Sequence, residues 1–222
     1  GTFNAEYGKA LTGVVNMVTK DGGNRLEGSF HTYSGDYLSN DPLYNDLDSF
    51  NSQDDRSISG TLSGPLIKNK VTFYSSGRIN SSNGWLNGLQ TFTIYGDSVF
   101  KDKNENLYFD GDEIRKSPYY KGLNGYSSWS TQNKLTFNIL KGTSIKINSI
   151  FNSRESQDFN HALQLLEDAQ LTNYNNGNFL SLSISHSLSP SSFFQINISE
   201  NKYKYESYLF DSPNDRRYIT PD

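Results

Sequence analysis

Hydrophobic and polar residues alternate with a period of two along most of the chain. The clearest case is 127–139, where Trp129, Leu135 and Phe137 share one side and Gln132 and Lys134 share the other. This alternation is typical of a β-strand with one apolar face and one polar face. The same pattern predicts seven strands, at 25–33, 56–63, 70–78, 127–139, 144–151, 178–187 and 192–205.

The connections between these strands alternate between short and long. The short ones, 64–69, 140–143 and 188–191, carry the Gly, Pro, Asn and Ser residues of tight turns. The long, polar ones are 34–55, 79–126 and 154–177. Outer-membrane β-barrels have this arrangement, with short turns at one end and long surface loops at the other, whereas soluble sandwiches rarely do. The pattern therefore favours a membrane barrel over a sandwich.

Seven strands do not make a complete bacterial barrel, because single-chain barrels close with an even number of antiparallel strands. An unclosed sheet edge in lipid leaves backbone groups unpaired at a cost of several kcal/mol each. We therefore expect the chain to be an internal piece of a longer protein, an expectation that fits a sequence starting at Gly1.

Composition narrows the possible functions. No run of hydrophobic residues exceeds three, which excludes the roughly 20-residue apolar segment of a transmembrane helix. Without cysteine there are no disulfides and no thiolate chemistry. The net charge of −4 and the pI near 5.4 argue against nucleic acid as a partner. Neither a nucleophile elbow, a P-loop nor an HExxH motif is present, so we expect no enzymatic activity.

Residues 4–24, NAEYGKALTGVVNMVTKDGGN, form a glycine-punctuated segment before the first predicted strand. This string resembles the C-terminal end of the plug domain of TonB-dependent outer-membrane receptors, followed by the first barrel strand. A second stretch, 59–74, is similar to that family's second strand, Gly-Pro turn and third strand. The residues that match the first stretch are Ala5, Glu6, Tyr7, Gly8, Gly13, Val14, Val15, Asn16, Thr19, Lys20, Gly22, Gly23, Asn24, Gly28, Ser29 and Phe30.

The resemblance implies an all-β fold in the cell outer membrane. Residues 1–24 would be the end of a plug domain and its linker, and 25–222 the N-terminal part of an antiparallel transmembrane β-barrel, about seven of its 22 strands. It implies TonB-coupled import of a large or scarce nutrient. The partners implied are outer-membrane lipid, an inner-membrane TonB-type energy-coupling protein acting on an upstream segment, and a nutrient ligand or surface lipoprotein. We expect Gly8, Gly13, Gly22 and Gly23 to permit tight turns and close backbone approach. Glu6 and Lys20 are expected to make polar contacts inside the plug or with the wall.

One candidate chemical site lies in the longest loop. Oxygen ligands recur there at EF-hand spacing, which suits Ca²⁺. Leu107 stands where an EF-hand has glycine, and the flanking residues do not predict helices, so a solvated acidic turn remains the alternative. The candidate ligands are Asp102, Asn104, Asn106, Tyr108 through its carbonyl, Asp110 and Glu113.

A secreted, calcium-stabilised β-sandwich adhesin or carbohydrate-binding module remains the alternative function. It would require the apolar side of the strands to be buried against a second sheet.

Two smaller features also lead to predictions. Residues 159–169 have the apolar spacing of a short amphipathic helix. Aromatic residues near strand ends suggest interfacial girdles, and they are Tyr33, Tyr37, Phe73, Tyr74, Trp129, Phe193, Phe194, Tyr203 and Tyr205.

Overall fold

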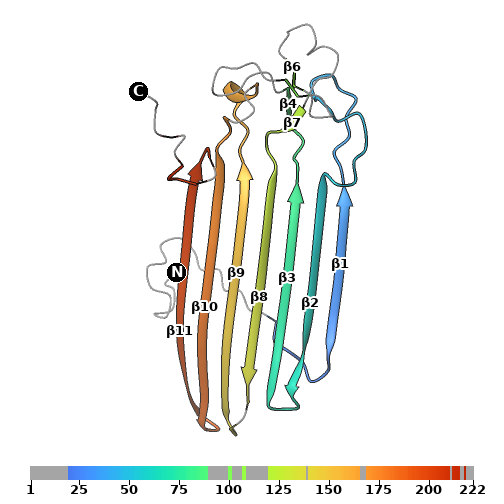
Figure 1. Ribbon diagram of the computed structural model, residues 1–222. Coiled ribbons are helices and arrows are strands. Elements are labelled where there is room, and N and C mark those ends of the chain that lie inside the picture. The colour runs from blue at the N-terminus through green and yellow to red at the C-terminus, as the bar shows by residue number, and fades with distance from the viewer. Residues whose placement is uncertain are drawn as a thin grey trace, which may run out of the picture.

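The chain is all-β, and its main body is a single antiparallel sheet of seven strands in the order β1-β2-β3-β8-β9-β10-β11 (Figure 1). The computed structural model describes residues 20–89, 100–101, 107–108, 120–138, 140–165, 169–210, 212–215 and 218. All seven predicted strands are present. Their bounds are β1 Glu27–Gly35, β2 Asp55–Ile67, β3 Val71–Ser82, β8 Tyr126–Phe137, β9 Thr143–Gln157, β10 Thr172–Ser189 and β11 Ser192–Tyr208.

Short and long connections alternate as predicted, and they lie at opposite ends of the sheet (Figure 1). We call these the turn end and the loop end. Short turns link β2 to β3, β8 to β9 and β10 to β11, while the other three links run through the loop end. Two short sheets belong to the loop-end connections, β4 (Asn87–Leu89) with β7 (Tyr120–Gly122), and β5 (Phe100–Lys101) with β6 (Leu107–Tyr108).

The strand register sorts the side chains onto two different faces. One rung of the ladder aligns Phe30, Gly60, Gly77, Thr131 and Phe151 across five strands. Because successive residues point to opposite sides, this rung and every second rung from it form one face. We call it the apolar face, and its large hydrophobic members include Phe30, Ile58, Leu62, Phe73, Ile79, Trp129, Leu135, Phe137, Ile147, Leu180, Leu182, Ile196 and Ile198.

The opposite side, which we call the polar face, carries mainly hydroxyl, amide and charged side chains. The predicted separation of Gln132 and Lys134 from Trp129 and Leu135 is therefore correct. Other members of the polar face are Glu27, Ser29, His31, Ser57, Ser59, Thr61, Ser63, Tyr74, Ser76, Arg78, Asn80, Ser128, Ser130, Thr136, Lys146, Asn148, Asn152, Arg154, Asn175, Ser181 and Ser183.

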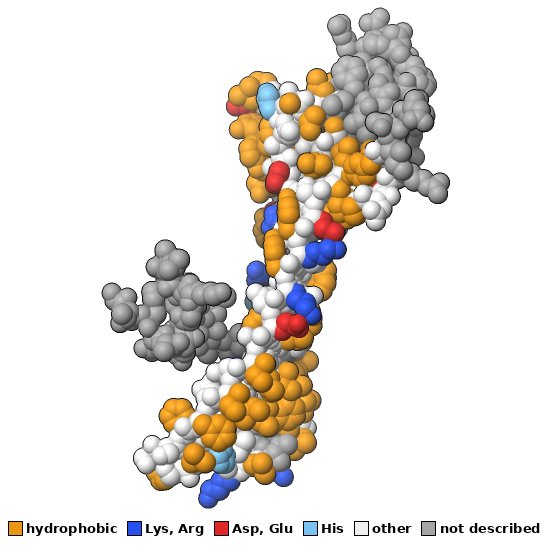
Figure 2. All heavy atoms as spheres, turned by 90° about the vertical axis from the view of Figure 1, so that its left-hand side faces the viewer, with side chains coloured by type: hydrophobic (Ala, Val, Ile, Leu, Met, Phe, Trp, Pro, Cys, Tyr) orange, Lys and Arg blue, Asp and Glu red, His pale blue; other side chains and the backbone are white. Residues whose placement is uncertain are grey.

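No second layer of described residues covers the apolar face. Phe30 is 70% exposed, Ile79 60% and Trp129 48%. Figure 2, turned to look onto the side of the molecule formed by β11, shows the middle of the body as one thin layer with hydrophobic clusters toward its ends. Among the described residues, the buried hydrophobic side chains are Leu47, Val71, Leu123 and Phe210. The described residues therefore have no core enclosed between two sheets.

The strands extend further into the loop end than the sequence pattern predicted. β10 begins at Thr172 rather than at 178, and the end of β9 reaches Gln157. These extra residues are largely polar on both faces, so the period-two signal disappears although the backbone ladder continues. Hydrogen bonding between backbones does not require an apolar face, which is why hydrophobic periodicity underestimated these strands.

Two smaller predictions were wrong. In place of an amphipathic helix over 159–169, the described residues contain a 3₁₀ turn at His161–Leu163, begun by Asn160, whose side chain accepts from the Ala162 N–H. Five of the girdle aromatics lie on the polar face instead of with Trp129, namely Tyr33, Tyr74, Phe193, Tyr203 and Tyr205. None of the described residues belongs to a helix with the length and apolar composition needed to cross a membrane.

Candidate functional site

The segment before β1 is attached to the polar face by one acidic side chain. Asp21 forms ion pairs with Lys134 of β8 and Lys146 of β9, the second with 2.9 Å between Nζ and Oδ2. The register explains why the two ammonium groups can share one carboxylate. Lys134 is opposite Asn148, and Lys146 is opposite Thr136, so the two lysines are diagonal neighbours on the same face. We call Asp21, Lys134 and Lys146 the clamp.

Burial and charge are unequal within the clamp. The Lys134 side chain is only 6% exposed, whereas Asp21 and Lys146 are partly open to solvent. Partial burial raises the pKa of the Asp21 carboxyl, but the hydrogen bonds and charges of Lys134 and Lys146 lower that pKa by more. The net pKa lies below its usual value. Asp21 is therefore ionised at neutral pH and neutralises part of the charge of a largely buried lysine.

The backbone next to Asp21 lies close against the sheet. A Cβ atom on Gly22 would overlap the carbonyl oxygen of Phe73 in β3, so a larger residue would push the segment away from the strand. This confirms the predicted close backbone approach at Gly22, whereas Gly23 has open space around it and Gly8 and Gly13 lie outside the described residues. The sequence also pointed to Lys20 and Glu6 as polar contacts. Lys20 is exposed, Glu6 lies outside the described residues, and it is Asp21 that contacts the sheet.

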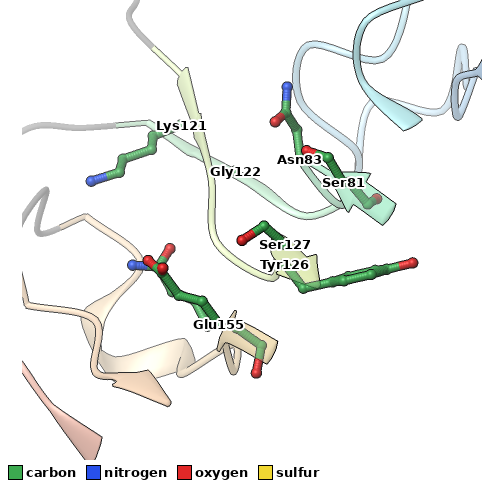
Figure 3. Close-up of a pocket in the computed structure, with 11 residues that line it drawn as sticks. Ser81, Asn83, Lys121, Gly122, Tyr126, Ser127 and Glu155 are labelled. Atoms are coloured by element: carbon green, nitrogen blue, oxygen red, sulfur yellow. The ribbon is translucent and has the colours of Figure 1, made fainter. Parts of the chain in front are cut away.

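A second feature is an open hollow of about 380 Å³ at the loop end. Its lining comes from the end of β3, the start of β8, the end of β9 and two residues of β7 (Figure 3). Polar and apolar atoms contribute about equally to its lining. The labelled residues that surround it in Figure 3 are Ser81, Asn83, Lys121, Gly122, Tyr126, Ser127 and Glu155.

Local packing holds the walls of this hollow in place. Leu123 is only 2% exposed, and its N–H donates to the Leu86 carbonyl. The side-chain oxygen of Asn124 accepts from the N–H groups of both Trp85 and Leu86. A Cβ on Gly122 would overlap the Asn83 carbonyl oxygen, so the two connections approach closely only with glycine there. The long connection is thus fixed at its two ends.

The chemistry of the hollow suits a ligand with many hydrogen-bonding groups. It offers hydroxyls, two amides, one ammonium and one carboxylate, while Arg154 lies over the Tyr126 ring at 4.3 Å from its centroid.

The predicted calcium ligands Asp102, Asn104, Asn106, Asp110 and Glu113 lie outside the described residues, and only the backbone of Tyr108 is placed, in β6. Among the parts of the chain that are described, no group of three or more acidic, histidine or cysteine side chains could hold a metal. The calcium site stays a prediction.

We expect protein with Asp110→Ala and Glu113→Ala to lose bound calcium. Elemental analysis after dialysis measures the calcium content, and the Asp48→Ala protein is the control.

Sequence analysis found neither the clamp nor the loop-end hollow. The alternation placed Lys134 on the polar side, but nothing local connected it to Asp21, 113 residues earlier. No protein-family description, curated protein or solved structure was found to match the chain. What can be inferred about function therefore depends on the geometry and on the resemblance of the first strands.

Proposed function

We propose that this chain forms part of the wall of a TonB-dependent outer-membrane receptor, which imports a large or scarce nutrient through a plugged β-barrel. In this proposal the apolar face contacts lipid, and the polar face lines the lumen. The segment that carries Asp21 is the end of the plug. The protein binds and moves its ligand without making or breaking covalent bonds.

The proposal depends on one observation, that the described residues outside the sheet contact its polar face but leave its apolar face exposed. The polar face holds the incoming segment through the clamp, while the apolar face exposes Phe30, Ile79 and Trp129 without a second layer of described residues. An exposed apolar surface of this extent is unfavourable in water and favourable against hydrocarbon tails. The β-sandwich alternative requires the opposite, a covered apolar face.

The placement of the connections supports the same proposal. All three long connections lie at one end of the sheet and the tight turns at the other, as in outer-membrane barrels. The loop-end hollow would then face the cell exterior, where its hydroxyl, amide and charged groups could first bind the nutrient. The clamp would hold the plug near the opposite end, on the path toward the periplasm.

Single cysteines can test this topology, because the chain contains no cysteine of its own. Asp48→Cys places a thiol in the first long connection and Lys68→Cys places one in the first tight turn, both at exposed positions. In intact cells, a membrane-impermeant maleimide should label the first variant and not the second. Permeabilising the outer membrane should then allow labelling of Lys68→Cys.

The outcomes of this experiment separate the two functions. Equal labelling of both cysteines in intact cells, or recovery of the protein from the medium without detergent, would support the secreted sandwich module and contradict the barrel wall. Labelling of the tight turn alone would invert the proposed orientation and remove the hollow from the nutrient side.

A further inference from the structure

The apolar face contains a hollow of about 480 Å³ between β1, β2, β3 and β8. Its floor is made of Gly60 and Gly77, which are opposite each other in the ladder. A Cβ on Gly77 would have no neighbour closer than the Ser130 carbonyl oxygen at 4.0 Å, so the space above Gly77 is open, whereas a Cβ on Gly60 would lie 3.3 Å from the Ser29 carbonyl oxygen. The walls are large hydrophobic side chains, Phe30, Ile58, Ile79 and Trp129.

A cation lies next to this hollow on the side of the loop end. Arg56 precedes Ile58 by two residues in β2 and therefore shares the apolar face with it, about 7 Å farther along the strand. Its guanidinium donates to the Gln53 side chain at 2.9 Å, which leaves most of its five N–H donors for another partner. The acidic group on the same rung, Glu155, is three strands away, roughly 14 Å at ordinary strand spacing.

From these observations we propose that the hollow binds an anionic membrane lipid, with one acyl chain over Gly60 and Gly77 and its phosphate at Arg56. This inference rests on the proposed membrane placement and adds a specific lipid site to it. The nearly all-hydrocarbon lining suits an acyl chain and offers nothing to a polar ligand. Arg is suited to phosphate because its planar fork donates two parallel hydrogen bonds.

The dimensions also fit one lipid in one leaflet. From Arg56 to Leu62 the strand covers six residues, roughly 20 Å, and a membrane strand tilted by about 45° would cross roughly 14 Å of depth over that length. Half of a hydrocarbon core is about 15 Å thick. The strand between these two residues, which passes the hollow, therefore matches the depth of a single acyl chain whose headgroup stays at the interface.

Trp129 provides a direct readout, since it forms one wall of the hollow. The complete protein is reconstituted in bilayers with Trp129 as its only tryptophan, which requires Trp85→Phe within these 222 residues. Its fluorescence is then quenched by brominated phosphatidylglycerol or by brominated phosphatidylcholine at the same mole fraction. We expect a preference of roughly threefold for the anionic lipid, the size of one exposed charge-assisted contact.

Two variants and one control isolate the site. Arg56→Gln, at an exposed position, should abolish the preference for phosphatidylglycerol without reducing quenching by phosphatidylcholine. Gly77→Leu should fill the floor and reduce quenching by both lipids, and Gly77→Ala is a milder form that the open space accommodates. Thr32→Leu adds a leucine to the apolar face outside the hollow. It should change neither the preference for phosphatidylglycerol nor the quenching by phosphatidylcholine.

The results also separate this inference from the proposed function. Strong quenching with equal response to both lipids, or a preference that survives Arg56→Gln, would overturn the lipid site and leave the membrane placement intact. Absence of quenching by either lipid would show that Trp129 is not in a bilayer, and both proposals would then fail.

Discussion

The two faces of the seven-stranded sheet are built from the same strands and differ in almost every chemical respect. On the polar face, serine, asparagine and tyrosine side chains bond across strands, as in Ser57 to Asn80 and Tyr205 to Asn173, and a clamp of three charges fixes the preceding segment. On the apolar face, aromatic and branched residues project from the sheet without a covering layer of described residues. One sheet therefore presents a polar surface crossed by hydrogen bonds and ion pairs, apart from the buried Thr136 Oγ1 and Asn148 Oδ1, and an apolar surface without a covering layer of described residues.

The comparison also shows where the free energy of the sheet originates. In a two-layer protein, burial of the apolar side would supply most of the stability. In this protein, the apolar face becomes buried only when material other than the described residues covers it. Under the proposed function the covering material is lipid, so substitutions on the two faces should have different consequences even at adjacent positions.

The largest effect is expected from adding a charge to each face in turn. Leu62 and Thr61 are neighbours in β2, and they lie on the apolar and polar faces respectively. Leu62→Arg should destabilise the protein in bilayers by about 2–4 kcal/mol, because it exposes a cation to hydrocarbon, whereas Thr61→Arg should cost less than about 1 kcal/mol. Denaturant titration of both variants in lipid vesicles measures the difference. Equal losses of unfolding free energy in the two variants would show that both faces are in contact with the same solvent.

The next effect concerns the clamp on the polar face. Asp21→Asn removes the carboxylate shared by Lys134 and Lys146 and leaves a largely buried ammonium without that counter-charge, at a cost of about 1–3 kcal/mol. We expect faster amide hydrogen exchange in residues 20–24. Lys20→Gln removes the neighbouring exposed charge and serves as the control. Unchanged exchange in the Asp21→Asn protein would mean that the ion pairs do not hold the segment.

The clamp should also depend on pH in one direction. Because the folded pKa of Asp21 is lowered, its contribution to stability is present above the unfolded pKa near 4 and is lost as the pH falls through the folded value. Hydrogen exchange of residues 20–24, measured from pH 7 to pH 3 and corrected for its intrinsic pH dependence, should rise only at the acid end. The Asp21→Asn protein should lack this rise, and a transition near neutral pH would assign it to another group.

The smallest effect is expected from a single polar-face hydroxyl. Tyr203 donates to Asn175 across the pair β10–β11, at an exposed position. Tyr203→Phe should cost no more than about 1 kcal/mol, since water can replace an exposed partner. Tyr33→Phe is the comparison, because Tyr33 lies on the same face and its hydroxyl makes no side-chain hydrogen bond with another described residue. A cost much larger than this would show that the polar face is shielded from water at β11.

Sequence periodicity predicted the body of the sheet well and its loop end poorly. The assignment of Leu135 and Lys134 to opposite faces is correct because residue spacing in a strand alone decides it. The start of β10 was misplaced because Asn173, Asn175 and Asn176 continue the ladder with polar groups on both sides. The tyrosines Tyr203 and Tyr205 were assigned to a girdle by residue type, whereas their register places both on the polar face.

The candidate sites required knowledge of the register. The clamp forms because β8 pairs with β9 in one particular register and the segment before β1 lies against these two strands. The hollow that we assign to a lipid exists because Gly60 and Gly77 are opposite each other. A shift by one residue would send each of these side chains to the other face, and neither site would form.

By itself, the sequence determined the seven strands of the main sheet, the alternation of long and short connections between them and the character of each face, because all of these follow from local residue patterns. It did not predict the four short strands β4, β5, β6 and β7. Only the tertiary structure decided which residues from distant strands become neighbours, where the incoming segment is held, and that no second layer of described residues covers the apolar face. The physical reason is that pairing between strands depends on the whole backbone ladder, whereas alternation within a strand depends on each residue and its nearest neighbours.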